Sequence, residues 1–319
     1  HTLSAYTPPS YTTYKNPPRL SKLAAKVISK IGAATKINKI VVDTSFFDEN
    51  GFNSYWKPTD RTNGYVSHIS ALMADADRSS SDLTKAHYSS WRSEAPAQNA
   101  ARLLRTALGE QAKSAKIVMG VKPEDAVSIS AVKSQPFAVW IEHAMHISDN
   151  TETEMIARHI QKMLVVPTTF KSVQPVTELM LGGLGISPQG LRMRDASGLA
   201  QSNRVTAKII AELLVEAAQK NSPIQSLPAL LPTPTSYGTL TGRFQGDNAV
   251  ARNAVSAKSG YIPGLSSLAG LVTAKDGTKL AFAFFARTQG DQKIGYGTKT
   301  AIDSLVTRAY VCGAKLTRN

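Results

Sequence analysis

Cysteine is nearly absent from this sequence: Cys312 is the only one, so no disulfide can form within the 319-residue chain. No apolar run approaches the roughly 18 residues that a membrane-spanning helix needs. His1 begins no recognisable signal peptide, so we expect a mature or truncated form with no transmembrane segment. A hydrophobic content of 42% with 19% charged residues excludes a disordered chain and indicates a globular one. Composition alone leaves the compartment open.

Acidic residues are also scarce: 23 Asp and Glu stand against 37 Lys and Arg, which gives a formal net charge of +14. Such an excess attracts anionic polymers, either nucleic acid or an acidic cell-wall polymer. General solubility is the alternative, and we favour it because the basic residues are scattered and no nucleic-acid motif is present. We therefore predict no nucleic-acid partner, and an anionic-polymer binding module is only a lesser alternative function.

The chain length and the apolar periodicity predict two domains, because 319 residues is long for one core. An irregular opening over residues 1–19 is followed by a pattern of helix then strand that occurs twice. The predicted elements are helices over 20–31 and 96–110, strands over 38–43, 65–75 and 116–120, and a loop at 79–81. We interpret residues 1–125 as an appended α/β domain and residues 126–319 as the main domain.

The first stretch with chemical potential is Ser148-Asp149-Asn150, between helices predicted over 137–147 and 151–164. A hydroxyl at Ser148 can pass a proton, and the Asn150 amide can both donate to and accept from a peptide bond. Helix capping is the alternative interpretation, since Ser, Asp and Asn all favour cap positions.

The second such stretch is Lys258-Ser259-Gly260, at the end of a strand that begins at Val255. Lys258 can attract a carboxylate, Ser259 can hydrogen-bond one, and Gly260 lets another backbone approach closely. Turns at Pro263-Gly264 and Asp276-Gly277 predict two further strands, over 266–273 and 279–286. These properties favour a groove that binds an extended peptide by its C-terminal end.

The two motifs are informative because they occur together and in order. A chain of this length contains Ser-Asp-Asn by chance about 5% of the time, and Lys-[Ser/Thr]-Gly roughly 15%. Both together in these contexts are expected by chance below ~1% of the time.

The pair is similar to the second and third motifs of penicillin-recognising serine enzymes. The intervening sequence resembles class C low-molecular-mass penicillin-binding proteins, the D-alanyl-D-alanine carboxypeptidase/endopeptidases of peptidase family S13. The resemblance is strong over about 128–312. Three further segments carry it: Asp195-Ala196-Ser197-Gly198-Leu199 with Asn203-Arg204-Val205, Tyr237-Gly238-Thr239-Leu240 with Arg243, and, more weakly, residues 40–46. Ser259 stands where the family usually has Thr, and Ala196 where Gly is usual.

The resemblance implies a serine DD-peptidase that cleaves D-Ala–D-Ala or cross-link peptide bonds of peptidoglycan through an acyl-enzyme. It implies that Ser148 relays a proton to the leaving D-alanine and that Asn150 orients the substrate amide. Lys258 and Ser259 would hold the terminal carboxylate, and a backbone N–H near Gly260 would contribute to the oxyanion hole. The implied partners are peptidoglycan stem peptides and β-lactam antibiotics, and the implied location is extracytoplasmic. No cofactor is implied.

The nucleophile is the departure from the family pattern. The family's Ser-x-x-Lys motif lies ahead of its large insertion, and we expect this chain to begin inside that insertion. Two Ser-x-x-Lys matches exist, at Ser54–Lys57 and Ser130–Lys133, and about one is expected by chance. Ser130 lies in a strand-like stretch that Pro136 follows closely, so no nucleophile helix fits behind it. We expect both serines to be ordinary residues, with Ser130 the remaining candidate inside the chain.

We therefore predict an α/β fold of the penicillin-binding and serine β-lactamase type. An antiparallel sheet covered by helices would be joined to the smaller appended α/β domain. Two rivals share this scaffold: a non-catalytic fragment or pseudoenzyme that binds peptidoglycan, and a β-lactamase or esterase. His143, His146 and His159 form no metal-binding motif, and we predict no metal site.

Overall fold

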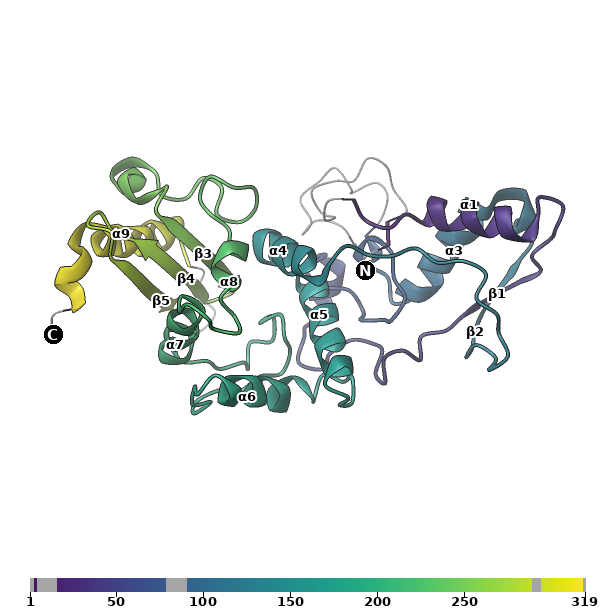
Figure 1. Cartoon of the computed structure of the whole chain (residues 1–319), viewed down its shortest axis with the longest axis horizontal. Coiled ribbons are helices and arrows are strands. Elements are labelled where there is room, and N and C mark those ends of the chain that lie inside the picture. The colour runs from purple at the N-terminus through teal and green to yellow at the C-terminus, as the bar shows by residue number, and fades with distance from the viewer. Residues whose placement is uncertain (1–2, 5–15, 79–90, 289–293, 318–319) are drawn as a thin grey trace. The chain divides into compact units, whose positions relative to one another are not determined.

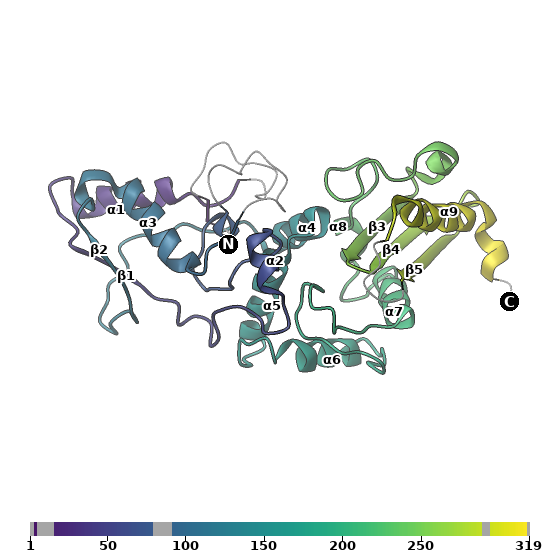
Figure 2. The same ribbon diagram turned by 180° about the vertical axis from the view of Figure 1, so that it is seen from behind.

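The structure is a computed structural model that describes residues 3–4, 16–78, 91–288 and 294–317 (Figures 1 and 2). The predictions for residues 1–19 and 79–81 fall wholly or largely outside these ranges. The chain forms two compact units. Unit 1 comprises His1–His143, Asp149–Val173 and Arg194–Ala200, and unit 2 comprises Ala144–Ser148, Gln174–Met193 and Gln201–Asn319. The division of residues 1–125 from 126–319 stays a prediction about domains.

One part of unit 1 is an α/β assembly that repeats helix then strand, as predicted. Its elements are α1 (Leu20–Ile31), β1 (Lys39–Val42), α3 (Pro96–Leu108) and β2 (Lys116–Met119), with a 3-10 turn, η4 (Gly109–Gln111), after α3. The strands β1 and β2 pair in parallel, from Lys39 opposite Lys116 to Val42 opposite Met119. The helices α1 and α3 pack together, and Ala24 and Leu108 lie in their shared core. This pairing follows from the repeat, because parallel strands need a crossover between them.

The strand predicted over residues 65–75 is wrong. The stretch makes only isolated bridges, such as Ile69 to Gly51, before the 3-10 turn η1 (Asp75–Asp77). The apolar residues Val66, Ile69 and Met73 of this stretch are instead buried in a second core of unit 1. That core contains Phe47, Trp56, Val66, Ile69, Met73, Met155, Phe170 and Ala200. In the described part of the chain no strand lies beside this stretch to pair with it, so its buried residues form no strand.

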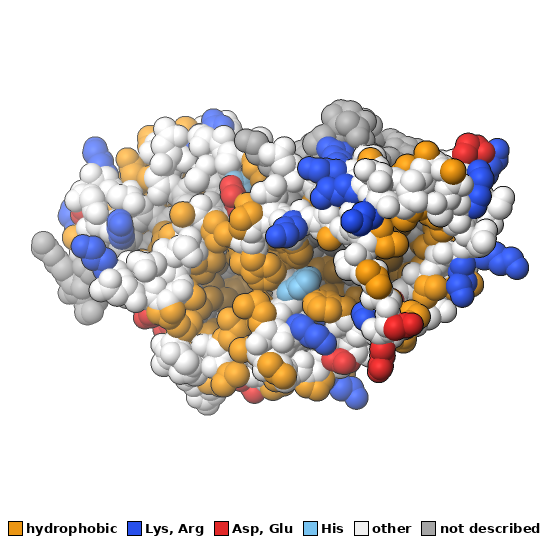
Figure 3. Space-filling model, turned by 45° about the vertical axis from the view of Figure 1, so that its right-hand side comes forward, with side chains coloured by type: hydrophobic (Ala, Val, Ile, Leu, Met, Phe, Trp, Pro, Cys, Tyr) orange, Lys and Arg blue, Asp and Glu red, His pale blue; other side chains and the backbone are white. Residues whose placement is uncertain are grey.

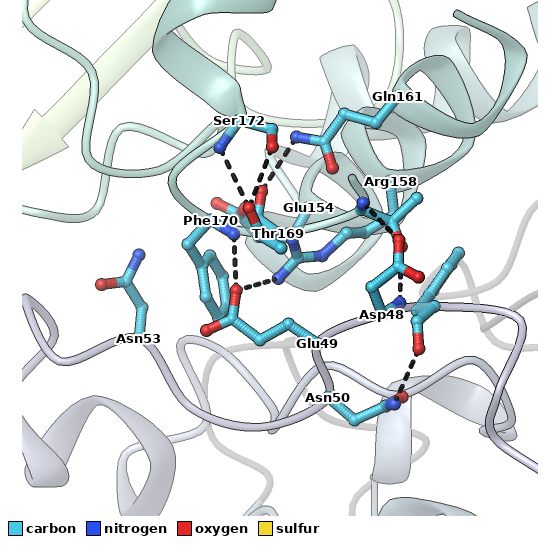
Figure 4. Close-up of polar contacts among 12 residues, drawn as sticks. Asp48, Glu49, Asn50, Asn53, Glu154, Arg158, Gln161, Thr169, Phe170 and Ser172 are labelled. Carbon is cyan, nitrogen blue, oxygen red and sulfur yellow. Dashed lines mark hydrogen bonds and ion pairs between the residues drawn. The ribbon is translucent and has the colours of Figure 1, made fainter. Parts of the chain in front are cut away.

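Polar contacts join two loops of unit 1 to α5 (Asn150–Met163) (Figure 4). The Glu49 carboxylate accepts a hydrogen bond from the Phe170 N–H at 2.8 Å and pairs with the Arg158 guanidinium at 3.6 Å. Asp48 accepts from both the N–H and the hydroxyl of Thr168, each at 2.8 Å. Arg158 is 1% exposed and lies 4.2 Å from the Phe170 ring centroid. Unit 1 therefore holds buried charge as part of its structure.

Unit 1 also contains a short helix, α2 (Pro58–Thr62).

Unit 2 is built on a three-stranded antiparallel sheet in the order β3 (Val255–Ile262), β4 (Leu265–Thr273), β5 (Lys279–Arg287). Helices α7 (Ala207–Ala217) and α9 (Tyr296–Cys312) both pack against this sheet (Figure 2). The main core joins the sheet to α9. It contains Leu240, Phe244, Ala251, Val255, Ala257, Leu268, Val272, Phe282, Ile302 and Val306. The predicted fold class, an antiparallel sheet covered by helices in an α/β protein, is confirmed.

The remaining elements connect these parts of the chain. Helix α4 (Phe137–Ile147) ends immediately before Ser148, and α6 (Val173–Gly183) follows α5. Short turns complete unit 2: α8 (Leu227–Leu230), η5 (Gly246–Ala251) and η6 (Gly313–Thr317). Within the described ranges, no helix combines the length and the apolar character needed to cross a bilayer. Lys and Arg side chains are spread over the face shown in Figure 3, between hydrophobic and uncharged side chains.

Candidate active site

Two residues that lie 110 positions apart in sequence, Ser148 and Lys258, meet in unit 2. Lys258 Nζ donates to Ser148 Oγ at 2.8 Å and to the Ser259 carbonyl at 2.7 Å. Ser148 follows the last residue of α4 and has a φ of 58°, a left-handed conformation that a non-glycine residue rarely adopts. Such strain persists only where the surrounding structure holds it, and it clusters at functional sites.

Burial changes the chemistry of Lys258. Removing the ammonium from water disfavours its charged form, and this desolvation lowers the pKa of Lys258 to about 8. The side chain therefore exchanges its proton near neutral pH, about two and a half pH units below an ordinary lysine. A group of this kind, hydrogen-bonded to a serine hydroxyl, can supply or accept a proton through that hydroxyl.

The Ser259 hydroxyl donates to Thr239 Oγ1 at 2.9 Å, so a third segment joins the site. The Thr239 N–H donates to the His146 carbonyl near the end of α4, also at 2.9 Å. Gly238 makes this contact possible: its φ is 108°, and a Cβ there would lie 2.1 Å from the same carbonyl oxygen. The loop that carries Thr239 is thereby fixed to the helix that carries Ser148.

A buried ion pair holds the same loop from the other side. The Arg243 guanidinium makes two-pronged contacts with the Asp303 carboxylate of α9, at 2.6 to 3.1 Å. Asp303 also accepts from the Phe244 N–H at 3.2 Å. Bidentate Arg–carboxylate geometry fixes orientation as well as distance, so this pair sets the position of the loop relative to the sheet.

Strand β3 is an edge of its sheet, paired only with β4 in the described part of the chain. The Ala257 N–H on the outer edge donates to the Pro232 carbonyl at 2.9 Å. In a strand, the N–H groups of residues two positions apart point to the same side, so the Ser259 N–H lies on that same outer edge. Gly260 is opposite Ser267 of β4, and a Cβ at Gly260 would lie 2.4 Å from Ser267 Oγ. The glycine therefore also relieves a clash between neighbouring strands.

Asn150 belongs to unit 1, where it is the first residue of α5. Its side-chain amide donates to the Tyr65 carbonyl at 3.0 Å. Asp149 is the N-cap of α5 and accepts from the Glu152 N–H, so the capping interpretation of the Ser-Asp-Asn motif holds for its middle residue. The structure brings Ser148, Lys258 and Ser259 together, and it fixes Asn150 by a separate contact.

Neither Ser-x-x-Lys match has a nucleophile helix. Ser54 is exposed in a turn, and Lys57 caps the short helix α2. Ser130 is half-buried in a stretch without regular secondary structure, and Lys133 is exposed. The strand-like conformation predicted for residues 127–132 is wrong. Its polar and apolar residues alternate as in a strand, but within the described residues no strand lies beside it to pair with it.

Two buried carboxylates in unit 1 hold the Asp195 segment. Asp195 accepts from the Trp56 indole N–H at 2.7 Å and from the Ala200 N–H at 2.6 Å. Glu154 of α5 accepts from the Ala196 N–H at 2.9 Å and the Ser197 N–H at 2.8 Å. Burial, together with the Asp195 charge, raises the pKa of Glu154 to about 7.

Sequence reasoning gave no role to Thr239 or Glu154. Thr239 lies in the Tyr-Gly-Thr-Leu segment, which the resemblance had already singled out. The sequence gives no comparable signal for Glu154, whose burial beside Asp195 appears only in the structure.

The three histidines singled out by their spacing have different environments. His143 contacts the buried Glu152 carboxylate, and His146 lies beside the Tyr237 ring at a centroid distance of 4.6 Å. His159 is surrounded by aromatic rings, and burial lowers its pKa. In the parts of the chain that the structure describes, no group of three or more His, Cys, Asp or Glu could hold a metal ion.

Comparison with known proteins is consistent across sequence and structure. A family model described as the D-Ala-D-Ala carboxypeptidase 3 (S13) family matches residues 84–309. Carboxypeptidase DacB of Mycolicibacterium smegmatis is 31% identical over 318 residues, which cover 98% of this chain and 66% of the relative. The chain thus spans about two thirds of the length of the curated relatives it matches.

Solved structures share the fold. The crystal structure of penicillin binding protein 4 from Haemophilus influenzae has a TM-score of 0.75 at 18% identity, covering 91% of this chain and 78% of that one. A structure of the same protein complexed with a β-lactam has a TM-score of 0.58 at 23% identity, covering 70% and 52%.

Proposed function

This chain belongs to the D-Ala-D-Ala carboxypeptidase 3 (S13) family, and we propose that it carries the substrate-binding and proton-transfer part of a serine DD-peptidase. The bond cleaved is the D-Ala–D-Ala or cross-link peptide bond of peptidoglycan stem peptides. The observation that carries the proposal is the contact between Lys258 Nζ and Ser148 Oγ, beside the Ser259–Thr239 hydroxyl pair.

The substrate binds along the outer edge of β3. An extended peptide can add to a sheet edge through main-chain hydrogen bonds. The Ser259 N–H on that edge is placed to donate to the carbonyl oxygen of the scissile bond and to stabilise the oxyanion that develops there. The terminal carboxylate of the substrate accepts from the Ser259 and Thr239 hydroxyls and is attracted by the Lys258 ammonium.

Proton transfer runs from Lys258 through Ser148 to the leaving group. The ammonium donates to Ser148 Oγ, which donates in turn to the amine nitrogen of the departing D-alanine. The nucleophilic serine has by then formed a C–O bond to the carbonyl carbon, so the scissile C–N bond breaks as the new N–H bond forms. The products are an acyl-enzyme, free D-alanine and a neutral Lys258 amine. Asn150 orients the substrate amide. Water later releases the acyl group, and a β-lactam that mimics the dipeptide stops the cycle at the acyl form.

Both roles of Lys258 require its protonated form. A bound substrate carboxylate favours the ammonium and raises its pKa, so substrate binding above pH 8 is coupled to proton uptake. This coupling separates the proposal from a purely structural lysine.

β-Lactams are proposed ligands of this protein, and the β-lactam complex of the similar Haemophilus influenzae protein supports that assignment. A peptidoglycan substrate also implies an extracytoplasmic location, where the cell wall is made and remodelled. The rivals are a non-catalytic chain of the same fold and a β-lactamase or esterase on the same scaffold.

The test is intact-mass spectrometry of this chain after incubation with a penicillin, followed by a D-alanine release assay on a D-Ala–D-Ala peptide. Both are repeated with the longest natural form of the protein that contains the chain. A stoichiometric adduct with D-alanine release in either form is the expected result. Peptide mapping of the adduct then identifies the nucleophile and decides whether it is Ser54, Ser130 or a serine outside this sequence.

Three other outcomes distinguish the rivals. Rapid loss of the adduct with hydrolysed penicillin and no D-alanine release indicates a β-lactamase. Reversible binding of penicillin or peptide without an adduct in either form indicates a pseudoenzyme. Absence of binding in both forms rejects the proposed site.

A further inference from the structure

A groove of about 510 Å³ lies along the outer face of α1 in unit 1. It is lined by Lys22, Ala25, Lys26, Ser29, Lys30, Ile129 and Ser130. Three of these residues are lysines spaced four positions apart, so they form one row along the helix. The three lysines are separate from Ser148, Lys258 and Ser259 of the proposed peptidase site, although Ser130, the nucleophile candidate inside the chain, is among the lining residues.

The segment of the sequence that contains α1 carries charge of one sign. Residues 1–42 contain seven basic residues and no acidic one, which is half of the net charge of +14 in the first 42 of 319 positions. The first acidic residue of the chain is Asp43. The net charge of the whole sequence does not show this asymmetry, because the basic residues never occur as a continuous run. In the helix, the four-residue spacing of Lys22, Lys26 and Lys30 places them in a line.

The lysines of the row have no acidic partner within the described residues. None of the ion pairs found there includes Lys22, Lys26 or Lys30. The one bond found in the row runs from Lys26 Nζ to the Ala131 carbonyl at 3.0 Å, which ties the helix to the far wall of the groove. Like charges four residues apart destabilise a helix, so the row has a cost that a bound anion would offset.

The opposite face of α1 explains how this cost is tolerated. Leu20 and Ala24 are buried, and with Leu108 and Ala100 they pack α1 against α3. The apolar face of the helix is thus covered by the protein. It is not available for insertion into a lipid surface, as the apolar face of a membrane-binding amphipathic helix would be.

We propose that this groove, lined by Lys22, Lys26 and Lys30, binds a linear polymer that repeats a phosphate group along its backbone and carries no nucleobases. Successive lysines are about 6 Å apart along the axis and the row is about 12 Å long, from the rise of 1.5 Å per residue. A line of separate ammonium groups fits an extended chain of repeated charges, whereas a single compact anion needs donors that converge. Among the residues that the structure describes, no aromatic side chain or arginine lines the groove, so these residues offer no platform for stacking nucleic-acid bases.

The probe is fluorescently labelled inorganic polyphosphate of defined length, titrated with the full chain at several salt concentrations. The variant is K22Q/K26Q/K30Q. The matched control is K171Q/K220Q/K279Q, which removes the same charge at three exposed lysines outside the groove. We expect the groove variant to lose about tenfold or more in affinity at low salt. The magnitude of its slope of log affinity against log salt should fall by about two, because three lysine contacts are lost and each contributes roughly 0.7.

Further arms identify the ligand. Poly(glycerol phosphate) is expected to bind with the same dependence on the three lysines. Equal weakening by the control variant would show an effect of net charge alone and overturn the proposal. Tighter binding of single-stranded DNA than of polyphosphate would overturn it as well, as would binding confined to vesicles containing anionic phospholipid. Circular dichroism of both variants confirms that the substitutions leave the fold intact. The outcome is independent of the penicillin assay.

Discussion

Lys258 in unit 2 and Glu154 in unit 1 both have a pKa that desolvation moves toward neutrality, and the two side chains have different neighbours. In unit 2, burial lowers the pKa of Lys258 to about 8, and its Nζ contacts the Ser148 hydroxyl. In unit 1, burial and the Asp195 charge raise the pKa of Glu154 to about 7, and its carboxylate accepts from two backbone N–H groups. A shifted pKa alone therefore does not distinguish a reactive group from a structural one.

What separates the two groups is where their hydrogen bonds go. Lys258 contacts a side-chain hydroxyl that can itself lose and regain a proton, and the neighbouring strand edge is available to a peptide. Glu154 accepts hydrogen bonds from backbone amides, which do not lose and regain a proton, and it is buried within unit 1. We infer that Lys258 acts on a substrate and that Glu154 fixes the Asp195 segment.

The largest effect should follow from removing the Lys258 ammonium. The Lys258→Met change removes the proton donor and the carboxylate partner while keeping the length of the side chain. We expect kcat/KM for a D-Ala–D-Ala peptide to fall by about 10²- to 10⁴-fold. The control is Lys279→Met, at an exposed lysine at the start of β5, which should leave the rate unchanged. Equal rates for Lys258→Met and wild type would show that Lys258 does not act in catalysis.

The Glu154→Gln change should alter stability rather than activity. Because the folded-state pKa of about 7 lies above the ordinary value of 4.5, the folded protein holds this proton more tightly than the unfolded chain does. The wild type therefore loses stability as pH rises from 4.5 to 7, by about 3 kcal/mol, and the variant lacks this loss. Urea unfolding at pH 4.5 and pH 8 measures it, with Glu124→Gln, at an exposed site, as control. A change in kcat/KM at pH 7 without a pH-dependent change in stability would contradict the assignment.

The pH profile gives a third and intermediate effect. Because Lys258 must be protonated, kcat/KM should fall about tenfold per unit above pH 8. The corresponding limb of kcat should lie at higher pH, since a bound carboxylate raises the pKa of Lys258. Steady-state kinetics from pH 6 to 10 test both. A rise in kcat/KM through pH 8 would mean that the neutral amine is the active form.

The smallest effect is expected at Thr239. Replacing it by valine removes the hydroxyl that accepts from Ser259, a hydrogen bond worth about 1 kcal/mol. We expect KM for the peptide to rise about fivefold with kcat little changed, since carboxylate binding is weakened. The matched control is Thr241→Val in the same loop, whose hydroxyl donates to the Ser236 carbonyl instead. If both variants raise KM equally, Thr239 acts through the loop and not through the substrate.

Sequence patterns predicted the strands of unit 2 well, because turn signals and apolar alternation both mark them. The Lys258 strand, the two hairpin turns and α4 with α5 were located to within a few residues. In contrast, α6 and α7 were not predicted, although the apolar residues of α7 recur at helical spacing. The stretch over 65–75 shows the reverse error, in which a loosely alternating sequence was taken for a strand.

For the candidate site, the two motifs identified Ser148, Lys258 and Ser259, but their proximity could not be derived from spacing. It depends on Gly238, whose missing side chain allows the His146 carbonyl to approach Thr239, and on the Arg243–Asp303 ion pair. Such contacts join segments about 90 and 60 residues apart, and local sequence does not encode them. The lysine row on α1 was visible in the sequence, but only the helix shows that its members are aligned.

The contact between Ser148 and Lys258 also has a consequence for how the chain folds. It closes a loop of 110 residues, so its formation waits until the ends of that loop are brought together against their chain entropy. The hairpins of the sheet, by contrast, close over short loops and can form early. The proposed binding of penicillin should therefore return later during refolding than secondary structure does, which would make the ligand a test of the last stage of assembly of unit 2.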